Sequence, residues 1–225
     1  MARVTALTPQ KERPDRYNLF LDGEFAVGLA LDVVVRHGLR VGDELSPLQV
    51  VSLQEDEGTA RALSDAYRLL SFRPRSRAEV VRYLTRREVD APTVERVLAR
   101  LAELGLIDDR EFAAYWVENR QAFRPRGPRA LQAELRQKGV GQQEIEAAVD
   151  TLAGDEEAAA ESVARPRAAR LSGLDAPSFR KKLSDFLLRR GFSYGVVRRV
   201  TDRLWTEQGG APPDDLGDDE ANNDP

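Results

Sequence analysis

The chain has 225 residues, of which 41% are hydrophobic and 32% are charged, and it contains no cysteine. This composition is typical of a globular protein with highly charged surfaces, and it excludes disulfide bonds and zinc sites built on thiolates. No apolar run reaches the roughly 20 residues that cross a bilayer. The first ten residues lack the apolar core of a signal peptide, so we expect a cytoplasmic protein that contacts no membrane.

The formal net charge of −4 conceals an uneven distribution along the chain. Residues 1–58 carry 6 basic and 10 acidic side chains. Residues 61–150 carry 17 basic and 14 acidic side chains, and residues 157–208 carry 11 basic and 6 acidic ones. Residues 209–225 contain 6 acidic side chains and no basic one. A basic body between two acidic ends indicates that the central part binds an acidic or polyanionic partner.

The N-terminal segment has the apolar alternation of β-strands. Alternating residues lie on both sides of Asp22-Gly23, a dipeptide that favours a two-residue hairpin because both turn positions need φ > 0. Residues 3–7 are a candidate third strand. A short helix is predicted at 31–37, ending at Gly38, and an amphipathic segment is predicted near 48–53. The acidic run at 55–58 is expected to be a linker, which places the first domain boundary there.

From Thr59 onward the apolar period changes to that of helices, and one pattern occurs three times. Five positions recur at steps of 51 and 52 residues, namely Pro74, Leu84, Arg87, Val94 and Leu101, then Pro125, Leu135, Lys138, Ile145 and Leu152, then Pro177, Leu187, Arg190, Val197 and Leu204. The third helix of each copy has apolar residues at i, i+3, i+4 and i+7, which share one face.

The sequence therefore predicts a mainly α protein with tandem three-helix repeats that form an elongated stack. The repeats are expected at residues 59–107, 108–153 and 154–208. A small N-terminal β-hairpin extension with a short helix is expected at 1–58, and a disordered acidic tail at 209–225.

Prolines, glycines and capping residues mark the predicted helix ends. Pro74 and Pro125 follow the first helix of their repeats, because a helix stops at or before the residue that precedes proline. Pro166 is expected to kink or break the first helix of the third repeat. Asp108 and Glu111 have the spacing of a capping box. Left-handed helix caps are predicted at Gly105, Gly139 and Gly191.

Catalytic machinery is not apparent in the sequence. The only histidine, His37, lies near a helix end, where capping or a surface position is favoured over catalysis. Asp108 and Asp109 are better explained by helix capping than by metal binding. No glycine-rich phosphate loop or nucleophile motif occurs. The sequence favours a binding protein without enzymatic activity, cofactor or metal.

Basic residues are the stronger indication of function. Arg87, Lys138 and Arg190 recur at the end of the second helix of each repeat, where cations also complement the helix dipole, so a purely structural role stays open. Repetition along a stack would line one side with cations, as expected for binding a regular polyanion or a periodic protein surface. The candidate partner-binding or DNA-binding residues are Arg73, Arg75, Arg86, Arg87, Arg124, Arg126, Arg136, Lys138, Arg180, Lys181, Lys182, Arg189 and Arg190.

Aromatic residues argue against a dedicated platform for stacking single-stranded bases. Phe112, Tyr115 and Trp116 fall on the apolar face of one helix, so core packing is favoured. Phe192 and Tyr194, beside Gly191, are expected to be more exposed than these three, although a staple between helices is the favoured interpretation for them too.

These motifs together resemble the RecX family of bacterial regulators of the RecA recombinase. The residues that carry the resemblance lie within about 60–207 and are Arg73-Pro74-Arg75-Ser76, Tyr83-Leu84, Leu104-Gly105-Leu106-Ile107-Asp108-Asp109, Phe112-Ala113, Gly127, Glu134-Leu135, Lys138-Gly139-Val140, Phe186-Leu187, Arg189-Arg190-Gly191-Phe192-Ser193 and Val200. The N-terminal strands resemble an extension found in some members. The chain departs from the family pattern at Glu88, where the sister repeats have glycine, and at Pro166.

The resemblance implies a tandem array of three-helix repeats, in agreement with the periodicity. It also implies a partner, because members of the family bind within the groove of the RecA filament on single-stranded DNA. They inhibit its ATPase, strand-exchange and coprotease activities, and so modulate recombination, DNA repair and the SOS response. We expect a monomer. A DNA-binding regulator that acts through its three-helix units independently of RecA is the alternative.

Overall fold

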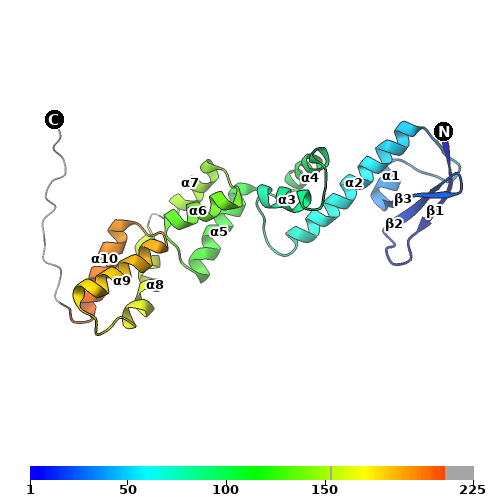
Figure 1. Cartoon of the computed structure of the whole chain (residues 1–225). Helices are drawn as coiled ribbons and strands as arrows, with labels where there is room; N and C mark the ends of the chain where they lie inside the picture. Colours follow the sequence, from blue (N-terminus) through cyan, green and yellow to red (C-terminus); the bar gives the residue numbers. More distant parts are fainter. Residues whose placement is uncertain (153, 211–225) are drawn as a thin grey trace, which may run out of the picture. The chain divides into compact units, whose positions relative to one another are not determined.

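The computed structural model describes residues 1–152 and 154–210, which belong to two compact units that divide after Asp108 (Figure 1). The first unit holds the strands and four helices, and the second holds six helices, counted within these described residues. Most of the acidic tail predicted to be disordered, from residue 211 onward, lies outside the described residues.

The first unit begins with an antiparallel sheet of four strands in the order β3-β2-β1-β4. The strands are β1 (Ala2–Pro9), β2 (Arg16–Leu21), β3 (Glu24–Ala30) and β4 (Glu44–Leu45). Asp22 and Gly23 join β2 to β3 with φ angles of 51° and 87°. The predicted hairpin is confirmed, because both turn residues have the positive φ that it requires. The candidate third strand is also confirmed, as β1 pairs with β2.

Two helices of the first unit contact this sheet, namely α1 (Leu31–Arg36) and α2 (Pro47–Leu70). The short helix predicted before Gly38 is confirmed, and Gly38 follows it with a φ of 60°. The prediction of a linker at 55–58 is wrong, because α2 continues through these residues for a total of 24 residues.

Glu57 explains why this acidic run is helical. Its side chain is 8% exposed and accepts hydrogen bonds from Arg16 Nη2 at 2.6 Å and from the backbone N–H of Ala30 at 2.7 Å. The domain boundary expected after residue 58 therefore falls within a helix. The same helix contributes Leu53 to the core under the sheet and Ala62 to the next core.

The rest of the chain forms three helical repeats, each with its own hydrophobic core. The first combines the C-terminal half of α2 with α3 (Arg77–Thr85) and α4 (Ala91–Glu103). The second contains α5 (Asp109–Phe123), α6 (Pro128–Lys138) and α7 (Gln142–Asp150), and the third contains α8 (Glu156–Ala169), α9 (Ala176–Arg189) and α10 (Tyr194–Glu207). The predicted fold class, mainly α with three-helix repeats and a small N-terminal sheet, is confirmed.

The apolar face predicted for the third helix of each repeat is buried. On α4, α7 and α10 the buried residues are Val94, Val97, Leu98 and Leu101, then Ile145, Ala148 and Val149 with Leu152 just beyond the helix, then Val197, Val200, Thr201 and Leu204. Burying such a side chain contributes about 1.5–3 kcal/mol for a large aliphatic residue, so this face is a main source of stability in each repeat.

The second helices end in the same way in all three repeats. Gly139 and Gly191 have left-handed φ angles of 81° and 83°, as predicted, and Glu88 takes the same conformation with a φ of 61°. In each case the next residue donates its backbone N–H to a leucine carbonyl five residues earlier, with distances of 3.3, 3.1 and 3.3 Å. Gly105, predicted to cap α4, also has a positive φ of 64°.

The break considered at Pro166 in the third repeat does not occur, because α8 continues through Pro166, which lies exposed within it while Ala160, Ala164 and Ala168 face the core. Phe192 is buried, in agreement with its interpretation as a staple between helices, because the apolar residue after a left-handed cap folds back onto its helix. Tyr194, by contrast, is 68% exposed, as expected.

Candidate functional site

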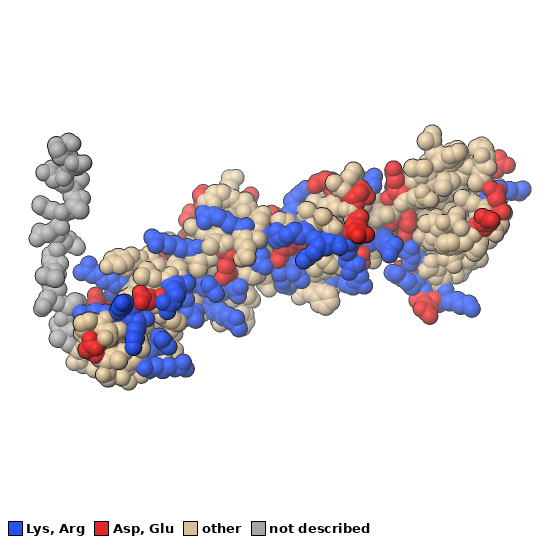
Figure 2. Space-filling model, viewed as in Figure 1, with Lys and Arg blue, Asp and Glu red and all other residues tan. Residues whose placement is uncertain are grey.

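Basic side chains are frequent on the helical repeats, as the view in Figure 2 shows. The structure separates the candidate cations into three kinds. Some are packed on aromatic rings, some are held by carboxylates or carbonyl groups, and some are exposed and have no contact of their guanidinium or ammonium group with other described residues.

The three recurring cations each lie on an aromatic ring of their own repeat. The Arg87 guanidinium lies 4.7 Å from the ring centre of Tyr83, the Lys138 ammonium 4.6 Å from Trp116, and the Arg190 guanidinium 4.8 Å from Phe186. Such cation–π contacts contribute about 0.5–1 kcal/mol at exposed sites and more when desolvated. The recurrence of charge at the end of each second helix therefore has a structural cause inside each repeat.

A first arginine cluster precedes α3. Both terminal nitrogens of Arg73 donate to the Glu79 carboxylate, at 3.1 and 2.8 Å, and Nη1 also donates to the Pro74 carbonyl. Glu79 and Ser76 form a capping box at the start of α3, so the carboxylate that orients Arg73 is itself fixed. Burial lowers the pKa of the neighbouring Arg75, and the positive charge of Arg73 lowers it further, partly offset by Glu79.

A second cluster lies between the second and third repeats, within the second unit. Arg190 Nη1 donates to the Pro125 carbonyl at 3.2 Å. Burial lowers the pKa of Arg190, and the positive charge of Arg126 lowers it further. Arg126 Nε lies 3.0 Å from Glu134 Oε1. Two guanidinium groups thus repel each other here, and an anion bound beside them would relieve that repulsion.

Two glycines allow the backbones of these repeats to meet beside this cluster. The N–H of Gly127 donates to the Arg190 carbonyl at 2.9 Å, and the N–H of Arg129 donates to the Gly191 carbonyl at 3.2 Å. A Cβ at Gly127 would overlap the Gly191 backbone, and one at Gly191 would overlap the backbone of Ala130. We call this contact the glycine junction. It fixes the third repeat against the second, and so it fixes Arg190 against Pro125.

The remaining candidate cations differ in how firmly they are held. Arg86 Nε donates to the Arg82 carbonyl, and Arg136 donates to the Gln142 side chain. Arg180 Nε lies 3.1 Å from Asp202 Oδ1, close enough for an ion pair but not aligned as a hydrogen bond. The candidates with exposed side chains whose guanidinium or ammonium group has no hydrogen bond, ion pair or ring contact to another residue of 1–152 or 154–210 are Arg124, Lys181, Lys182 and Arg189. The positive charge of Lys182 nevertheless contributes to lowering the pKa of Asp175, which hydrogen bonds from Ser178 lower most.

Much of the remaining positive charge of the third repeat is neutralised by a network between α8 and α10. Arg199 and Arg203 bind Glu157, and Arg203 and Arg165 bind Glu161. Hydrogen bonds from arginines, chiefly Arg199 for Glu157 and Arg165 for Glu161, lower the pKa of both carboxyl groups. The cations left available on this repeat therefore lie mainly on α9.

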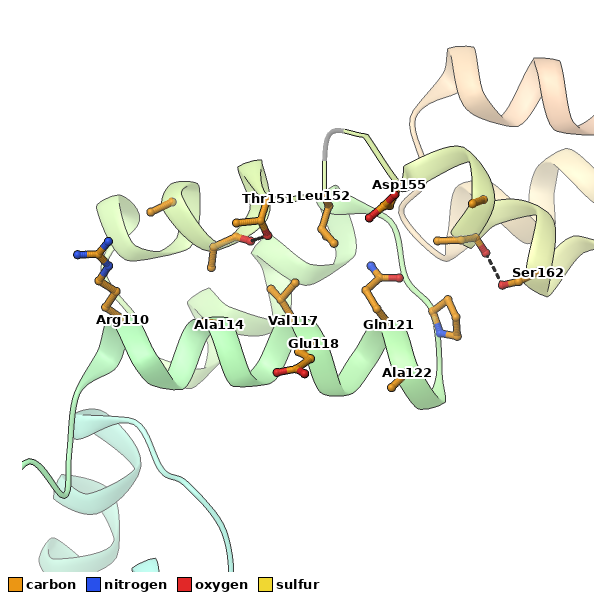
Figure 3. Close-up of a pocket in the computed structure, with 15 residues that line it drawn as sticks. Arg110, Ala114, Val117, Glu118, Gln121, Ala122, Thr151, Leu152, Asp155 and Ser162 are labelled. Atoms are coloured by element: carbon orange, nitrogen blue, oxygen red, sulfur yellow. Dashed lines mark hydrogen bonds between the residues drawn. The ribbon is translucent and has the colours of Figure 1, made fainter.

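A cavity of about 820 Å³ lies in the second unit between α5, α7 and α8 (Figure 3). Its lining is rich in alanine. The hydroxyl groups of Thr151 and Ser162 donate to the backbone carbonyls of Ala148 and Ala159, at 2.7 and 2.8 Å, so neither points a free nucleophile into the space. The cavity offers room for an apolar group and no recognisable set of reacting residues.

Metal-ligand residues are not clustered in the described part of the chain. No group of three or more histidine, cysteine or acidic side chains there could hold a metal ion. His37 Nε2 lies 2.7 Å from Asp56 Oδ2, an ordinary pairing between α1 and α2. No described helix has both the length and the apolar character required to cross a membrane.

Sequence reasoning missed the aromatic partners of the recurring cations, although two of them had a readable signal. Tyr83 precedes Arg87 by four residues and Phe186 precedes Arg190 by four, the spacing at which helical side chains touch. Trp116 reaches Lys138 from another helix, and no local spacing indicates that contact.

Comparison with known proteins gives matches along nearly the whole described chain. Four family models match: the regulatory protein RecX N-terminal domain over residues 2–46, and the first, second and third RecX three-helix domains over 62–101, 108–149 and 155–201.

Curated relatives and solved structures agree with these matches. The chain is 30% identical to regulatory protein RecX of Bacillus pumilus, covering 92% of this chain and 80% of that protein. It is 42% identical to regulatory protein RecX of Thermobifida fusca, covering 63% of this chain and 77% of that protein. A crystal structure of regulatory protein RecX matches with a TM-score of 0.76 at 28% identity, covering 90% of this chain and all of that one. The structure of RecX from Lactobacillus salivarius, 23% identical, matches in fold with a TM-score of 0.62 over 66% of this chain and 97% of that one.

Proposed function

The chain belongs to the RecX family of regulatory proteins, and we propose that it is a non-enzymatic inhibitor of the RecA recombinase. It binds in the groove of the RecA filament on single-stranded DNA and lowers ATPase, strand-exchange and coprotease activity. The observation that carries this proposal is that all four RecX domain models match in order, from residue 2 to residue 201.

The exposed cations that make no hydrogen bond, ion pair or ring contact among the described residues support a filament as the target. A RecA filament repeats one subunit along a polyanionic strand, so a chain of repeats with unpaired cations can contact it at several places. A helix of 14 residues such as α10 is only about 21 Å long. Contact with successive subunits therefore requires the repeats to act in series, and inhibition follows when the motions needed for ATP turnover are hindered.

Charge reversal on α9 tests this proposal. RecA ATPase on single-stranded DNA is titrated with the unaltered chain and with Lys181→Glu/Lys182→Glu, which alters two exposed lysines that make no hydrogen bond, ion pair or ring contact among the described residues. We expect half-inhibition to need at least about tenfold more variant, equivalent to roughly 1.4 kcal/mol of lost binding. The control Lys11→Glu/Arg13→Glu makes the same charge change in the β1–β2 loop and should inhibit normally.

The same measurements discriminate the alternative. Equal inhibition by the α9 variant and by the loop control would remove α9 from the filament contact. Failure of the unaltered chain to inhibit RecA, together with sequence-selective binding to duplex DNA, would instead support a DNA-binding regulator that acts without RecA.

A further inference from the structure

The tetrapeptide Phe-Arg-Pro-Arg occurs twice in the chain, at residues 72–75 and 123–126. Each copy lies at the end of the first helix of its repeat, since α2 ends at Leu70 and Phe123 is the last residue of α5. The third repeat lacks it and has Asp175-Ala176-Pro177-Ser178 at the corresponding place. We call the two copies the Phe-Arg elements.

The phenylalanines of both elements are unusually exposed. Phe72 and Phe123 are each 78% exposed, whereas Phe112, Phe179 and Phe192 are at most 2% exposed in the repeat cores. The cores are complete without these two rings, so folding does not explain why both positions carry a large apolar side chain. A single exposed apolar residue is common on protein surfaces. An exposed ring that recurs at the same place in two repeats, with the same flanking arginines, indicates a surface that a ligand covers.

Guanidinium groups accompany each exposed ring. In the first element Glu79 holds Arg73 in place, and the half-buried Arg75 has a buried Nε with no hydrogen-bond partner among the described residues. In the second element Arg124 is exposed and makes no hydrogen bond or ion pair through its guanidinium with the described residues, and Arg126 lies in the cluster with Arg190. Each ring therefore comes with positive charge that an anion can use.

A nucleotide of a single strand offers the chemistry that matches such an element. Its base presents a flat face on which a phenyl ring stacks, and its phosphate accepts hydrogen bonds from guanidinium groups. An acidic protein surface would satisfy the arginines but would not require a flat aromatic ring beside them in both copies. The pairing of ring and cation, used twice, therefore favours single-stranded DNA over a protein partner.

We propose that Phe72 and Phe123 each stack on a base of single-stranded DNA, while the arginines of the same elements contact the adjacent phosphates. Most of the aromatic rings considered for base stacking from the sequence lie in the cores, whereas Phe72 and Phe123 are exposed. The proposal deepens the proposed function, since it assigns a direct DNA contact to a protein that binds a DNA filament. Binding to DNA measured without RecA tests the stacking proposal independently of the proposed function.

The test is the affinity for a labelled oligothymidylate of about 30 nucleotides, measured by fluorescence anisotropy without RecA at low salt. We expect Phe72→Ala or Phe123→Ala to weaken binding at least about fivefold, and both together at least about 25-fold, because base stacking on one ring has roughly that value or more. Phe72→Trp and Phe123→Trp should restore binding, and the added tryptophan fluorescence should be quenched by the DNA. The matched control is Phe25→Ala, which removes a ring that is 60% exposed on β3 and has no arginine next to it in sequence.

Each other outcome overturns the stacking proposal. Unchanged DNA affinity in the double alanine variant, or no detectable DNA binding by the unaltered chain, excludes base stacking by these rings. If that variant also loses inhibition of RecA ATPase, the rings contact a protein surface. If it still inhibits RecA, the proposed function stands without a role for the Phe-Arg elements.

Discussion

The glycine junction makes a sharp prediction about how the second and third repeats are held together. Replacing Gly127 by alanine adds a single methyl group at a residue whose φ of −73° suits any amino acid, so the backbone itself is not strained. The methyl group would overlap the Gly191 backbone. Overpacking costs about 1–3 kcal/mol, and the two backbone hydrogen bonds that would be displaced contribute about 0.5–1.5 kcal/mol each. The variant should therefore lose about 2 kcal/mol or more.

Gly141→Ala is the matched control for this change. Gly141 precedes α7 as Gly127 precedes α6, with a similar φ of −67°, but a Cβ there would meet only the end of the flexible Glu144 side chain. Unfolding is followed by circular dichroism and by fluorescence of the two tryptophans, Trp116 in the second repeat and Trp205 in the third. A difference of about 2 kcal/mol corresponds to a midpoint roughly 4–8 °C lower for Gly127→Ala. Equal midpoints for the two variants would mean that the backbones do not meet as described.

Three further variants test local features of the fold. Glu88→Gly should stabilise the chain by about 0.5–1 kcal/mol in thermal unfolding, because a left-handed residue with a Cβ is replaced by glycine, and Glu88→Ala should give no such gain. Glu57→Ala should lower the free energy of unfolding, measured by urea denaturation, by about 3–5 kcal/mol, because it leaves the buried Arg16 without its carboxylate partner. A loss as small as that for a surface carboxylate would contradict the buried ion pair. Hydrogen bonds from arginines lower the pKa of Glu157 and Glu161. These two carboxylates therefore stabilise the fold above about pH 4.5, and this stabilisation is lost as the pH falls through their folded pKa values. Glu157→Gln/Glu161→Gln should accordingly make the free energy of unfolding less dependent on pH in acid.

The parts of the fold that the sequence predicted depend on local periodicity. The apolar face of each third helix, the hairpin at Asp22-Gly23 and the left-handed caps at Gly139 and Gly191 are all set by residues within a few positions of one another. Such residue types indicate the local backbone conformation directly, and these predictions are therefore confirmed.

The features that the sequence did not predict depend on residues far apart in the chain. Glu57 looked like part of an acidic linker because its partner, Arg16, lies 41 residues earlier. The packing role of Gly127 has no local signal in the sequence, because its missing side chain matters only where Gly191 approaches it from another repeat. Composition and periodicity do not indicate such pairs, so the sequence predicts a linker where Glu57 is buried and does not predict the glycine junction.

The recurring cations show why contacts between distant residues also matter for predicting function. Repetition of Arg87, Lys138 and Arg190 suggested a line of charge for a partner, but each of them lies on a ring of its own repeat. A repeated residue in a repeat protein is expected wherever the repeat must fold, so repetition alone does not separate folding from binding. An exposed ring that recurs beside the same arginines is a better guide to binding, because packing within the repeat does not account for it. By that criterion the binding residues are sought among the Phe-Arg elements and the exposed lysines of α9, rather than among the positions that recur in all three repeats.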